Sequence, residues 1–529
     1  MSKQSENKAA LTIMVQGTAS DVGKSLVTAA LCRIFRQDGY TVAPFKSQNM
    51  SLNSYVTWDG KEIGRAQGMQ ADACGVLATT DMNPILLKPT REMSSQVVVH
   101  GKPLRDFSAR EYRESYLPQA GVIVREALAR LRSSNDIVVL EGAGSPAEIN
   151  LKDRDIVNMR MAAWADAPVI LVADIDRGGV FASIVGTLEL LEPDERERVC
   201  GFVINKFRGD VGLLQPGVDW LEERTGKPVL GVLPFLPGLA LEDEDSLSLD
   251  RKLEEQVKGR PDTLDIVVLR LPRISNFTDA DPLYFEADVG LRFVDRLEQW
   301  GAPDAVILPG SKNTVEDLLW LRETGLAQQI TAFAEKGGHL VGICGGYEML
   351  GAMLLDPAGV ESEHKETPGF GFFPFDVKFA GEKKTVRVEG NARAASAWLT
   401  EKLPVEGYEI HMGEIIQHGE LRQPFAIRSQ QAGVESLQVG ELTYEGEGAC
   451  SADGRLWGTF IHGILHNDDL RRAWLNDIRE ARGWEPLAAE LRFRENREEA
   501  FDRLAAHTRE HLNMPLVYKL LGAGEELGA

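Results

Sequence analysis

Residues 11–37 read LTIMVQGTASDVGKSLVTAALCRIFRQ, and this stretch decides the fold of the N-terminal half. Leu11–Val15 is apolar and predicts a buried strand. Ser25–Gln37 carries apolar residues at helical spacing and predicts an amphipathic helix. The loop Gly17–Ser25 (GTASDVGKS) lies between them. A strand, a tight loop and a helix in this order predict an α/β fold.

The loop Gly17–Ser25 has the composition of a site for nucleotide phosphates, although Gly17 and Gly23 are one residue further apart than in the standard GxxxxGK[ST] pattern. Its small residues let backbone N–H groups point toward one centre, and the helix N-terminus adds positive charge. Lys24 supplies a cation for the outer phosphates, and the Ser25 hydroxyl can join a Mg²⁺ shell. We predict that the loop binds ATP through Thr18, Asp21, Val22, Gly23, Lys24 and Ser25.

Polar residues follow several further apolar runs of the N-terminal half. The expected strands are Ile137–Leu140, Val169–Ala173, Phe202–Ile204 and Val229–Leu233. Glu141 follows the first of them and is a candidate Mg²⁺ ligand. Asp174 follows the second and is a weaker candidate for the same role. Asn205 follows the third, where its amide can contact the adenine edge. Each residue alone is explained equally well as a loop cap, but their shared position at the carboxyl edge of one sheet favours a site.

The stretch Gly338–Gly351 (GHLVGICGGYEMLG) predicts a strand, a sharp turn and a helix, with Cys344 at the turn. Glycines at 342, 345 and 346 remove the side chains that would obstruct such a bend. The helix N-terminus favours a thiolate, so Cys344 is a candidate nucleophile, the alternative being a buried core cysteine. The turn Leu308–Thr314 follows a neighbouring strand, so Gly310 and Gly345 are candidates for an oxyanion hole.

A cysteine nucleophile needs a base, and His462 is the best placed histidine. It follows the apolar run Leu456–Ile461, which predicts a strand, and Gly463 comes next. His411 is the second candidate and is more typical of a structural histidine. His466 is a candidate helix cap.

The 529 residues carry 58 Lys and Arg against 80 Asp and Glu, a net charge of −22. This balance argues against general nucleic-acid binding, which depends on clustered cations. No apolar run approaches the ~18 residues of a membrane helix, and Met1–Ala10 lacks a signal-peptide core. Five cysteines without a CxxC pair fit a reducing compartment. We expect a cytoplasmic protein without nucleic-acid or membrane partners.

The α/β alternation occurs twice along the chain and predicts two domains. Residues 1–240 form the nucleotide-binding domain, and the acidic stretch 241–262 is interpreted as a linker. A second α/β domain is expected over 263–475, starting with the strands Ile266–Leu269, Ala305–Leu308 and His339–Ile343. Residues 476–529 are interpreted as a helical C-terminal segment whose apolar face packs within its own domain.

Several further motifs extend this pattern over almost the whole chain. They are Phe45–Ser54 (FKSQNMSLNS), Glu62–Gln67 (EIGRAQ), Met82–Pro89 (MNPILLKP), Leu140–Asn150 (LEGAGSPAEIN) and Leu308–Thr314 (LPGSKNT). With the phosphate loop, the elbow cysteine and the late histidine in this order, the chain resembles the cobyric acid synthase family of glutamine-dependent amide ligases. Its N-terminal domain resembles dethiobiotin synthetase, and its C-terminal domain resembles a class I, flavodoxin-like glutaminase.

The resemblance implies a function and roles for further residues. MgATP would phosphorylate a corrinoid carboxylate in the N-terminal synthetase domain, with Lys24 and Lys46 offsetting phosphoryl charge. Ser25 and Glu141 would hold the metal, with Asp59 as a further ligand. Cys344 and His462 would release ammonia from L-glutamine. The implied reaction amidates the b, d, e and g side chains of adenosylcobyrinic acid a,c-diamide, with ATP and Mg²⁺ as cofactors.

One position departs from the class I glutaminase pattern. That pattern has a Glu two residues after the catalytic histidine, whereas this chain has Ile464. We therefore expect Cys344 and His462 to work as a dyad without a carboxylate partner, as in related corrinoid amidases. The orientation of the imidazole is left unexplained by the sequence.

Three alternatives share parts of this pattern. Cobyrinate a,c-diamide synthase has both domain types but a different signature after Lys46. Cytidine triphosphate synthase has a similar layout but would carry the His-x-Glu that is missing here. A non-enzymatic ATPase switch of the chromosome-partitioning type would have an extra lysine near the start of the loop and no cysteine domain.

Overall fold

Two compact units make up the described part of the chain. The computed structural model describes residues 9–91, 94–152, 155–239, 241, 262–399, 402–430 and 444–522. Unit 1 combines Met1–Ser51, Glu62–Glu244 and Arg497–Ala529, and unit 2 combines Leu52–Lys61 and Asp245–Asn496. Each unit is described by itself.

Unit 1 is built on a parallel sheet whose strands include all of those expected in the N-terminal half. The strand order is β12-β11-β10-β1-β9-β2. The strands are β1 (Leu11–Gly17), β2 (Val42–Phe45), β9 (Ile137–Glu141), β10 (Val169–Asp174), β11 (Val199–Phe207) and β12 (Val229–Pro234). The central strands β1, β9 and β10 are almost entirely buried, as their continuous apolar runs require.

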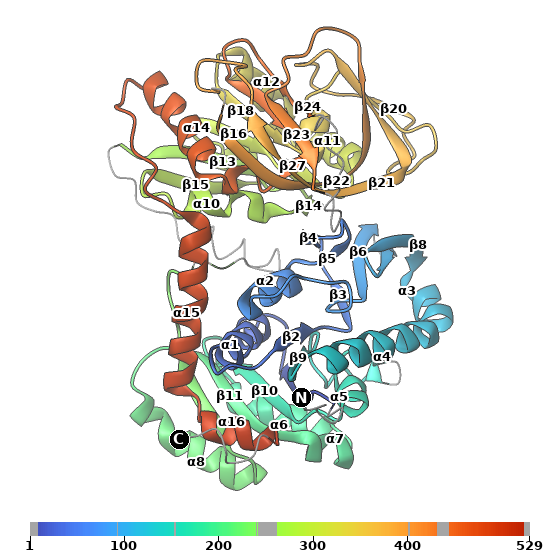
Figure 1. Ribbon diagram of the computed structural model, residues 1–529, viewed down its shortest axis with the longest axis vertical. Coiled ribbons are helices and arrows are strands. Elements are labelled where there is room, and N and C mark those ends of the chain that lie inside the picture. Colours follow the sequence, from blue (N-terminus) through green and yellow to red (C-terminus); the bar gives the residue numbers. More distant parts are fainter. Residues whose placement is uncertain are drawn as a thin grey trace, which may run out of the picture. The chain divides into compact units, whose positions relative to one another are not determined.

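Helices and a smaller sheet complete unit 1 (Figure 1). The helices are α1 (Lys24–Gln37), α2 (Arg65–Cys74), α4 (Leu117–Ser134), α5 (Met159–Ala165), α6 (Val180–Leu190), α7 (Pro193–Arg198) and α8 (Val211–Thr225). The smaller sheet has the order β3-β6-β7-β8, from β3 (Gln48–Met50), β6 (Ile85–Arg91), β7 (Ser94–Val99) and β8 (Lys102–Ser108). The helix predicted after the phosphate loop is confirmed as α1, whose apolar face enters the core.

The C-terminal helical segment groups with unit 1 from Arg497 onward. α15 (Phe493–His511) and α16 (Met514–Leu520) place Phe501, Ala505 and Val517 in the same apolar core as α1. The N–H of Asn513 donates to the Leu230 carbonyl at 2.8 Å. Figure 1 shows α16, in red, beside the green strands of unit 1. An amphipathic pattern indicates which face of a helix is buried but not which unit covers that face.

Unit 2 contains a second, mainly parallel sheet with the order β15-β13-β16-β18-β26-β25. Its strands are β13 (Leu264–Leu269), β15 (Val289–Val294), β16 (Ala305–Leu308), β18 (His339–Ile343), β25 (Ala449–Cys450) and β26 (Leu456–Thr459). The strands predicted at Ile266–Leu269, Ala305–Leu308 and His339–Ile343 are confirmed. The helices α11 (Thr314–Glu323), α12 (Leu326–Glu335) and α14 (Asp468–Ala481) bury apolar side chains in the core of this sheet.

Unit 2 also contains a mostly antiparallel sheet, and its strand β27 ends at His462 (Figure 1). Its main path is β20-β19-β21-β22-β27. The strands are β19 (Met353–Leu355), β20 (Glu366–Pro368), β21 (Phe375–Ala392), β22 (Pro404–Gln417) and β27 (Ile461–His462), and β23 (Phe425–Ser429) and β24 (Glu445–Glu447) attach to β21. The strand pair β22–β27 positions His462 opposite Tyr408.

The compact units differ from the expected domain boundaries in one further respect, the grouping of residues 52–61. Most of the expected linker 241–262 lies outside the described residues. The segment Leu52–Lys61, which was expected within the first domain, groups with unit 2.

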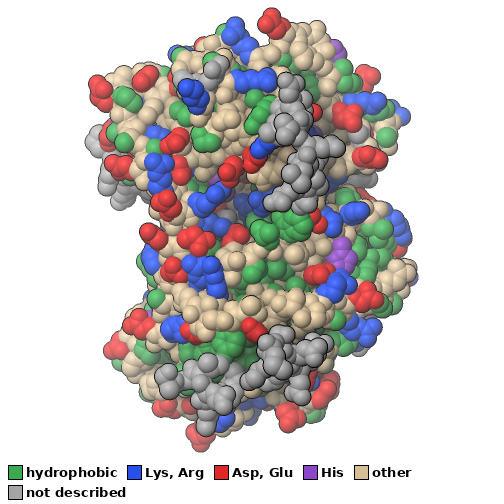
Figure 2. All heavy atoms as spheres, viewed as in Figure 1, with side chains coloured by type: hydrophobic (Ala, Val, Ile, Leu, Met, Phe, Trp, Pro, Cys, Tyr) green, Lys and Arg blue, Asp and Glu red, His purple; other side chains and the backbone are tan. Residues whose placement is uncertain are grey.

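Every helix among the described residues falls short of the length and apolar character needed to cross a bilayer. Basic and acidic side chains are interspersed on the face drawn in Figure 2.

Candidate functional site

The phosphate loop of unit 1 turns at residues with left-handed backbone conformations. Asp21 has φ 58° and Gly23, at the start of α1, has φ 98°. The positive φ of Gly23 strains any residue with a side chain, and a Cβ there would also lie 2.1 Å from Nδ2 of the Asn205 side chain. The N–H of Thr18 donates to the Val172 carbonyl at 2.9 Å, which ties the start of the loop to β10.

Ser25, Lys46 and Gln70 converge on the Glu141 carboxylate. Glu141, at the end of β9, is buried and accepts a hydrogen bond from the Ser25 hydroxyl at 2.8 Å. The same oxygen is 3.0 Å from the ammonium of Lys46. Gln70 of α2 donates to the other carboxylate oxygen at 2.5 Å. Lys24 is buried at the loop, where its ammonium donates to the Ala19 carbonyl at 2.9 Å.

This arrangement suits Mg²⁺ bound together with nucleotide phosphates. Mg²⁺ prefers hard oxygen ligands and commonly takes one or two protein oxygens, with phosphate and water completing its octahedron. The Ser25 hydroxyl and the Glu141 carboxylate are such a pair, 2.8 Å apart. The described residues contain no group of three or more His, Cys, Asp or Glu side chains that could hold a metal by themselves. The chemistry of the donor set therefore fits a metal that arrives with ATP.

Residues at the ends of β10 and β11 also contact the phosphate loop. Nδ2 of Asn205 donates to the Val22 carbonyl at 2.8 Å. Lys206 donates to the Asp21 carbonyl at 2.6 Å and lies 2.9 Å from the Asp174 carboxylate. Asn205 and Asp174 thus lie at the loop, as their strand-end positions predicted, and in this structure they support its backbone.

Asp59 lies in the other compact unit from Ser25 and Glu141, within the segment Leu52–Lys61. Its carboxylate accepts a hydrogen bond from Thr57 at 2.5 Å and pairs with Lys61 at 2.8 Å. The structure therefore does not bring Asp59 together with the other two candidate ligands within one unit.

Cys344 forms the sharp turn expected from its flanking glycines. It lies between β18 and the short helix α13 (Gly345–Met349), with φ 51° and ψ −111°. A Cβ on Gly346 would lie 1.9 Å from the Leu308 carbonyl oxygen, so only glycine permits this close approach of α13 to β16. The N–H of Cys344 donates to the Thr459 carbonyl at 2.8 Å, and its thiol donates to the Ile410 carbonyl at 3.5 Å.

Burial raises the pKa of the Cys344 thiol well above its ordinary value, and the negative charge of Glu348 raises it further. The hydrogen bond from the Gly345 amide acts in the opposite direction but is the smaller effect. The sequence suggested that the helix N-terminus favours the thiolate, and the net shift is the reverse. A neutral thiol must lose its proton to a base before it attacks a carbonyl carbon.

The candidate oxyanion-hole glycines lie next to one another and to the candidate base. A Cβ on Gly345 would be 2.9 Å from the backbone nitrogen of Ser311. A Cβ on Gly310 would be 3.1 Å from Cε1 of His462. Gly310 belongs to β17 (Gly310–Ser311), which pairs with β14 (Ile274–Ser275). The elbow, the Gly310 turn and His462 therefore border one site within unit 2.

His462 has a carboxylate partner, contrary to the expectation of an unpartnered dyad. Nδ1 of His462 is 2.7 Å from a carboxylate oxygen of Asp279, which lies in the 3-10 turn η3 (Phe277–Ala280). Both side chains are buried. Asp279 is 183 positions before His462, so a search for His-x-Glu could not find it. The stretch Ser275–Asp279 (SNFTD) carried no motif that singles out this residue in one sequence.

His411 is held in a way that suits a structural histidine. Its Nδ1 donates to the Gly413 carbonyl at 2.8 Å, and its ring stacks on Phe460 with centroids 3.7 Å apart. Burial lowers the pKa of His411 to about 3, so the ring stays neutral at physiological pH. His466 does not cap α14, because that position is Asn467, and its Nε2 instead donates to the Thr278 carbonyl at 3.0 Å.

Two carboxylates that the sequence analysis missed lie near the elbow, the buried Glu348 and the half-buried Glu361. Glu348 of α13 accepts a hydrogen bond from the Thr314 hydroxyl at 2.6 Å, and Glu361 accepts one from the Thr314 N–H at 2.8 Å. Burial raises the pKa of Glu348 to about 7 and raises that of Glu361 well above its ordinary value. A ligand cation would offset this cost of burial, so the pair suits an ammonium group.

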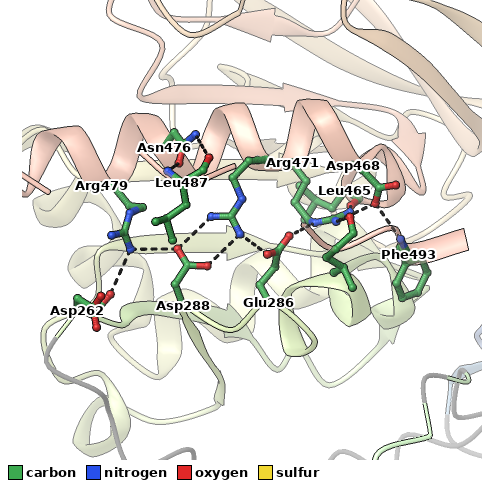
Figure 3. Close-up of polar contacts among 12 residues, drawn as sticks. Asp262, Glu286, Asp288, Leu465, Asp468, Arg471, Asn476, Arg479, Leu487 and Phe493 are labelled. Atoms are coloured by element: carbon green, nitrogen blue, oxygen red, sulfur yellow. Dashed lines mark hydrogen bonds and ion pairs between the residues drawn. The ribbon is translucent and has the colours of Figure 1, made fainter. Parts of the chain in front are cut away.

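An arginine network anchors the helix that follows His462 (Figure 3). Arg471 of α14 donates to Glu286 at 2.7 Å and to the Leu465 carbonyl at 2.8 Å. Arg472 and Arg479 of the same helix bind Asp288 at 3.0 and 3.1 Å. These carboxylates precede β15, so the network joins α14 to the segment that follows η3.

The comparisons with known proteins agree with the two-unit organisation. Residues 13–249 match the family model described as "CobQ/CobB/MinD/ParA nucleotide binding domain", and residues 265–470 match "CobB/CobQ-like glutamine amidotransferase domain". The chain is similar to "Cobyric acid synthase" of Desulforamulus reducens, with 51% identity over 98% of this chain and 99% of the relative. It is equally similar to proteins of that name from Geobacillus kaustophilus (50% identity, 97% of this chain, 98% of the relative) and Sorangium cellulosum (51%, 97% and 99%).

Proposed function

This chain belongs to the cobyric acid synthase family, and from that membership we propose that it amidates the b, d, e and g carboxylates of adenosylcobyrinic acid a,c-diamide. It is an ATP-dependent amide ligase of cobalamin biosynthesis with glutamine as nitrogen donor. The observation that carries the assignment is the presence in one chain of a phosphate loop whose Ser25 contacts Glu141 and of an elbow cysteine whose neighbouring turn borders His462. The three alternative families are not favoured, because relatives named for this activity match nearly the full chain.

Ammonia release belongs to unit 2. His462 takes the proton of the Cys344 thiol, and the sulfur attacks the side-chain carbonyl carbon of glutamine. The backbone N–H groups at Gly345 and Ser311, adjacent to Gly310, stabilise the oxyanion. The protonated His462 then gives its proton to the departing nitrogen, and ammonia and a glutamyl thioester result. Water activated by His462 hydrolyses the thioester and restores the thiol. Glu348 and Glu361 receive the α-ammonium of glutamine.

Amide formation belongs to unit 1. A substrate carboxylate attacks the terminal phosphorus of ATP, giving an acyl phosphate and ADP, and ammonia then displaces inorganic phosphate to form the amide. Lys24 and Lys46 offset the charge on the transferred phosphoryl group. Ser25 and Glu141 would hold Mg²⁺, which would neutralise phosphate charge. The role of Asp59 as a further metal ligand stays a prediction.

The purified chain tests the proposed function directly. We expect conversion of adenosylcobyrinic acid a,c-diamide to adenosylcobyric acid that depends on ATP and glutamine. Mass spectrometry monitors the stepwise conversion of side-chain carboxyl groups to amides. Cobyrinic acid without amides is the matched control, because the a,c-diamide synthase acts on it. Turnover of the control but not of the a,c-diamide would assign the chain to that relative.

The choice of base is tested by two histidine variants. We expect His462→Ala to lose glutamine hydrolysis and to slow alkylation of Cys344 by iodoacetamide near neutral pH, because the buried thiol then lacks its proton acceptor. His411→Ala should leave the alkylation rate near wild type, because the His411 ring is hydrogen-bonded to the Gly413 carbonyl and stacked on Phe460. The assignment is wrong if the two variants exchange these phenotypes.

A further inference from the structure

We propose that Asp279 is the positioning carboxylate of the glutaminase site: it holds His462 in the tautomer and orientation that the reaction requires, and replaces the carboxylate expected at position 464. The inference rests on the proposed function of Cys344 and His462. It concerns a residue that lies 183 positions before the histidine, on a different element from the usual one.

The Asp279 carboxylate uses both of its oxygens on the His462 segment. One oxygen lies 2.7 Å from Nδ1 of His462, and the other accepts the N–H of Gly463 at 2.8 Å. The imidazole ring and the backbone that carries it are thus fixed by one rigid group. His462 is fully buried and Asp279 is nearly so, which excludes water as a competing partner for these atoms.

The opposite ring nitrogen shows which tautomer is held. Nε2 of His462 is 3.2 Å from Nδ2 of Asn276. Oδ1 of Asn276 accepts the backbone N–H of Ser54 at 2.8 Å, so the amide orientation is set and its N–H₂ group faces the histidine. Nε2 must therefore be an acceptor, and the proton lies on Nδ1, toward Asp279. This is the tautomer in which Nε2 can take the thiol proton.

The surroundings of η3 keep Asp279 in place. Asn276 adopts φ 50°, and its carbonyl accepts the N–H of Asp279 at 3.0 Å, which closes the turn. His466 donates to the carbonyl of Thr278 at 3.0 Å. The Tyr408 ring covers one face of His462, with centroids 5.2 Å apart. Glu286 follows Asp279 in sequence and Arg471 follows His462, and the ion pair between them joins α14 to the segment after η3 (Figure 3).

An amide at position 279 cannot reproduce this arrangement. Asp279 faces two N–H donors, on His462 and on Gly463, and a carboxylate accepts from both. Asparagine has one acceptor oxygen and one N–H₂ group. In one orientation its N–H₂ group faces an N–H donor, either that of Gly463 or that of His462 Nδ1. In the other its oxygen accepts from Gly463 and its N–H₂ group donates to Nδ1 of His462, which moves the imidazole proton to Nε2. Asp279→Asn is therefore nearly isosteric but selects the wrong tautomer.

The test measures glutamine hydrolysis by the full chain. We expect Asp279→Asn to lower kcat on the order of 10³- to 10⁴-fold, with KM for glutamine changed much less, because the substituted atoms touch the base and not the substrate. Alkylation of Cys344 should slow as it does in His462→Ala. In Asp279→Ala, added formate should restore part of kcat by supplying the missing carboxylate.

Asp288→Asn is the matched control, since it removes a buried carboxylate of the same unit that binds Arg472 and Arg479 and not His462. We expect it to lower the melting temperature while leaving kcat within about threefold of wild type. The proposal is overturned if Asp279→Asn keeps kcat within that range, or if Asp288→Asn loses kcat equally. If wild type hydrolyses glutamine but amidates no corrinoid, the proposed function fails while this inference stands.

Discussion

Replacing Cys344 with serine is expected to abolish glutamine-dependent amidation and to leave ammonia-dependent amidation close to wild type. Removing the nucleophile of a covalent mechanism costs on the order of 10⁴-fold or more in kcat. The buried elbow offers no substitute, because a serine hydroxyl is a far weaker nucleophile than sulfur and its only base is His462. The phosphate loop belongs to the other compact unit, so ATP-dependent activation of the substrate does not require Cys344.

The measurement compares product formation with glutamine and with an ammonium salt at a pH where free ammonia is present. Cys450→Ser is the matched control, since Cys450 is also buried in unit 2 but lies on the edge strand β25. We expect it to retain both activities. Loss of ammonia-dependent turnover in a folded Cys344→Ser variant would contradict the separation of the two chemistries.

The second large effect is expected for Lys24→Ala, which should remove amidation with either nitrogen source. Acyl phosphate formation precedes attack by ammonia, so a defect at the phosphate loop affects both routes equally. Lys24 is buried and already held against the loop by the Ala19 carbonyl, so its charge is preorganised for the phosphates. We expect the loss of such a cation to lower the rate on the order of 10³-fold.

Glutaminase activity in the absence of corrinoid and ATP distinguishes a local defect from misfolding in this variant. We expect Lys24→Ala to retain that activity, because Cys344 and His462 belong to unit 2. Lys102→Ala, on an exposed position of β8, is the control and should be neutral for both activities. Near-normal ammonia-dependent turnover by Lys24→Ala would show that the ATP site lies elsewhere.

Local sequence determined the elements that carry each half of the chemistry. The phosphate loop and the cysteine elbow are each encoded within about twenty residues, because a turn between a strand and a helix depends on nearby glycines and on the apolar runs that flank it. The strand ends at Glu141 and Asn205 were predictable for a related reason. In a parallel sheet, the carboxyl ends of all strands lie at one edge, so residues at those positions meet the same loop.

Contacts between distant segments were decided only by the tertiary structure. The helical pattern of residues 497–522 required burial of one face, but several apolar surfaces satisfy that requirement and the pattern does not choose unit 1. The segment Leu52–Lys61 likewise reads as part of the first domain, although Ser54 donates to Asn276 in unit 2. The direction of the Cys344 pKa shift also required the structure, because burial is a property of the whole fold and it outweighs the adjacent amide.

Asp279, the hydrogen-bond partner of His462, shows most clearly what the sequence determined and what only the tertiary structure decided. The sequence determined that position 464 is isoleucine and that no carboxylate stands at the usual spacing. It could not determine that the turn after β14 brings Asp279 to Nδ1, because a hydrogen bond depends on the position of two atoms in space and not on their separation along the chain. Any of the chain's 80 acidic residues satisfies the chemical requirement for an orienting carboxylate. Only the packing of η3 against β27 and against the 3-10 turn η5 (Ile464–His466) selects the one that meets it.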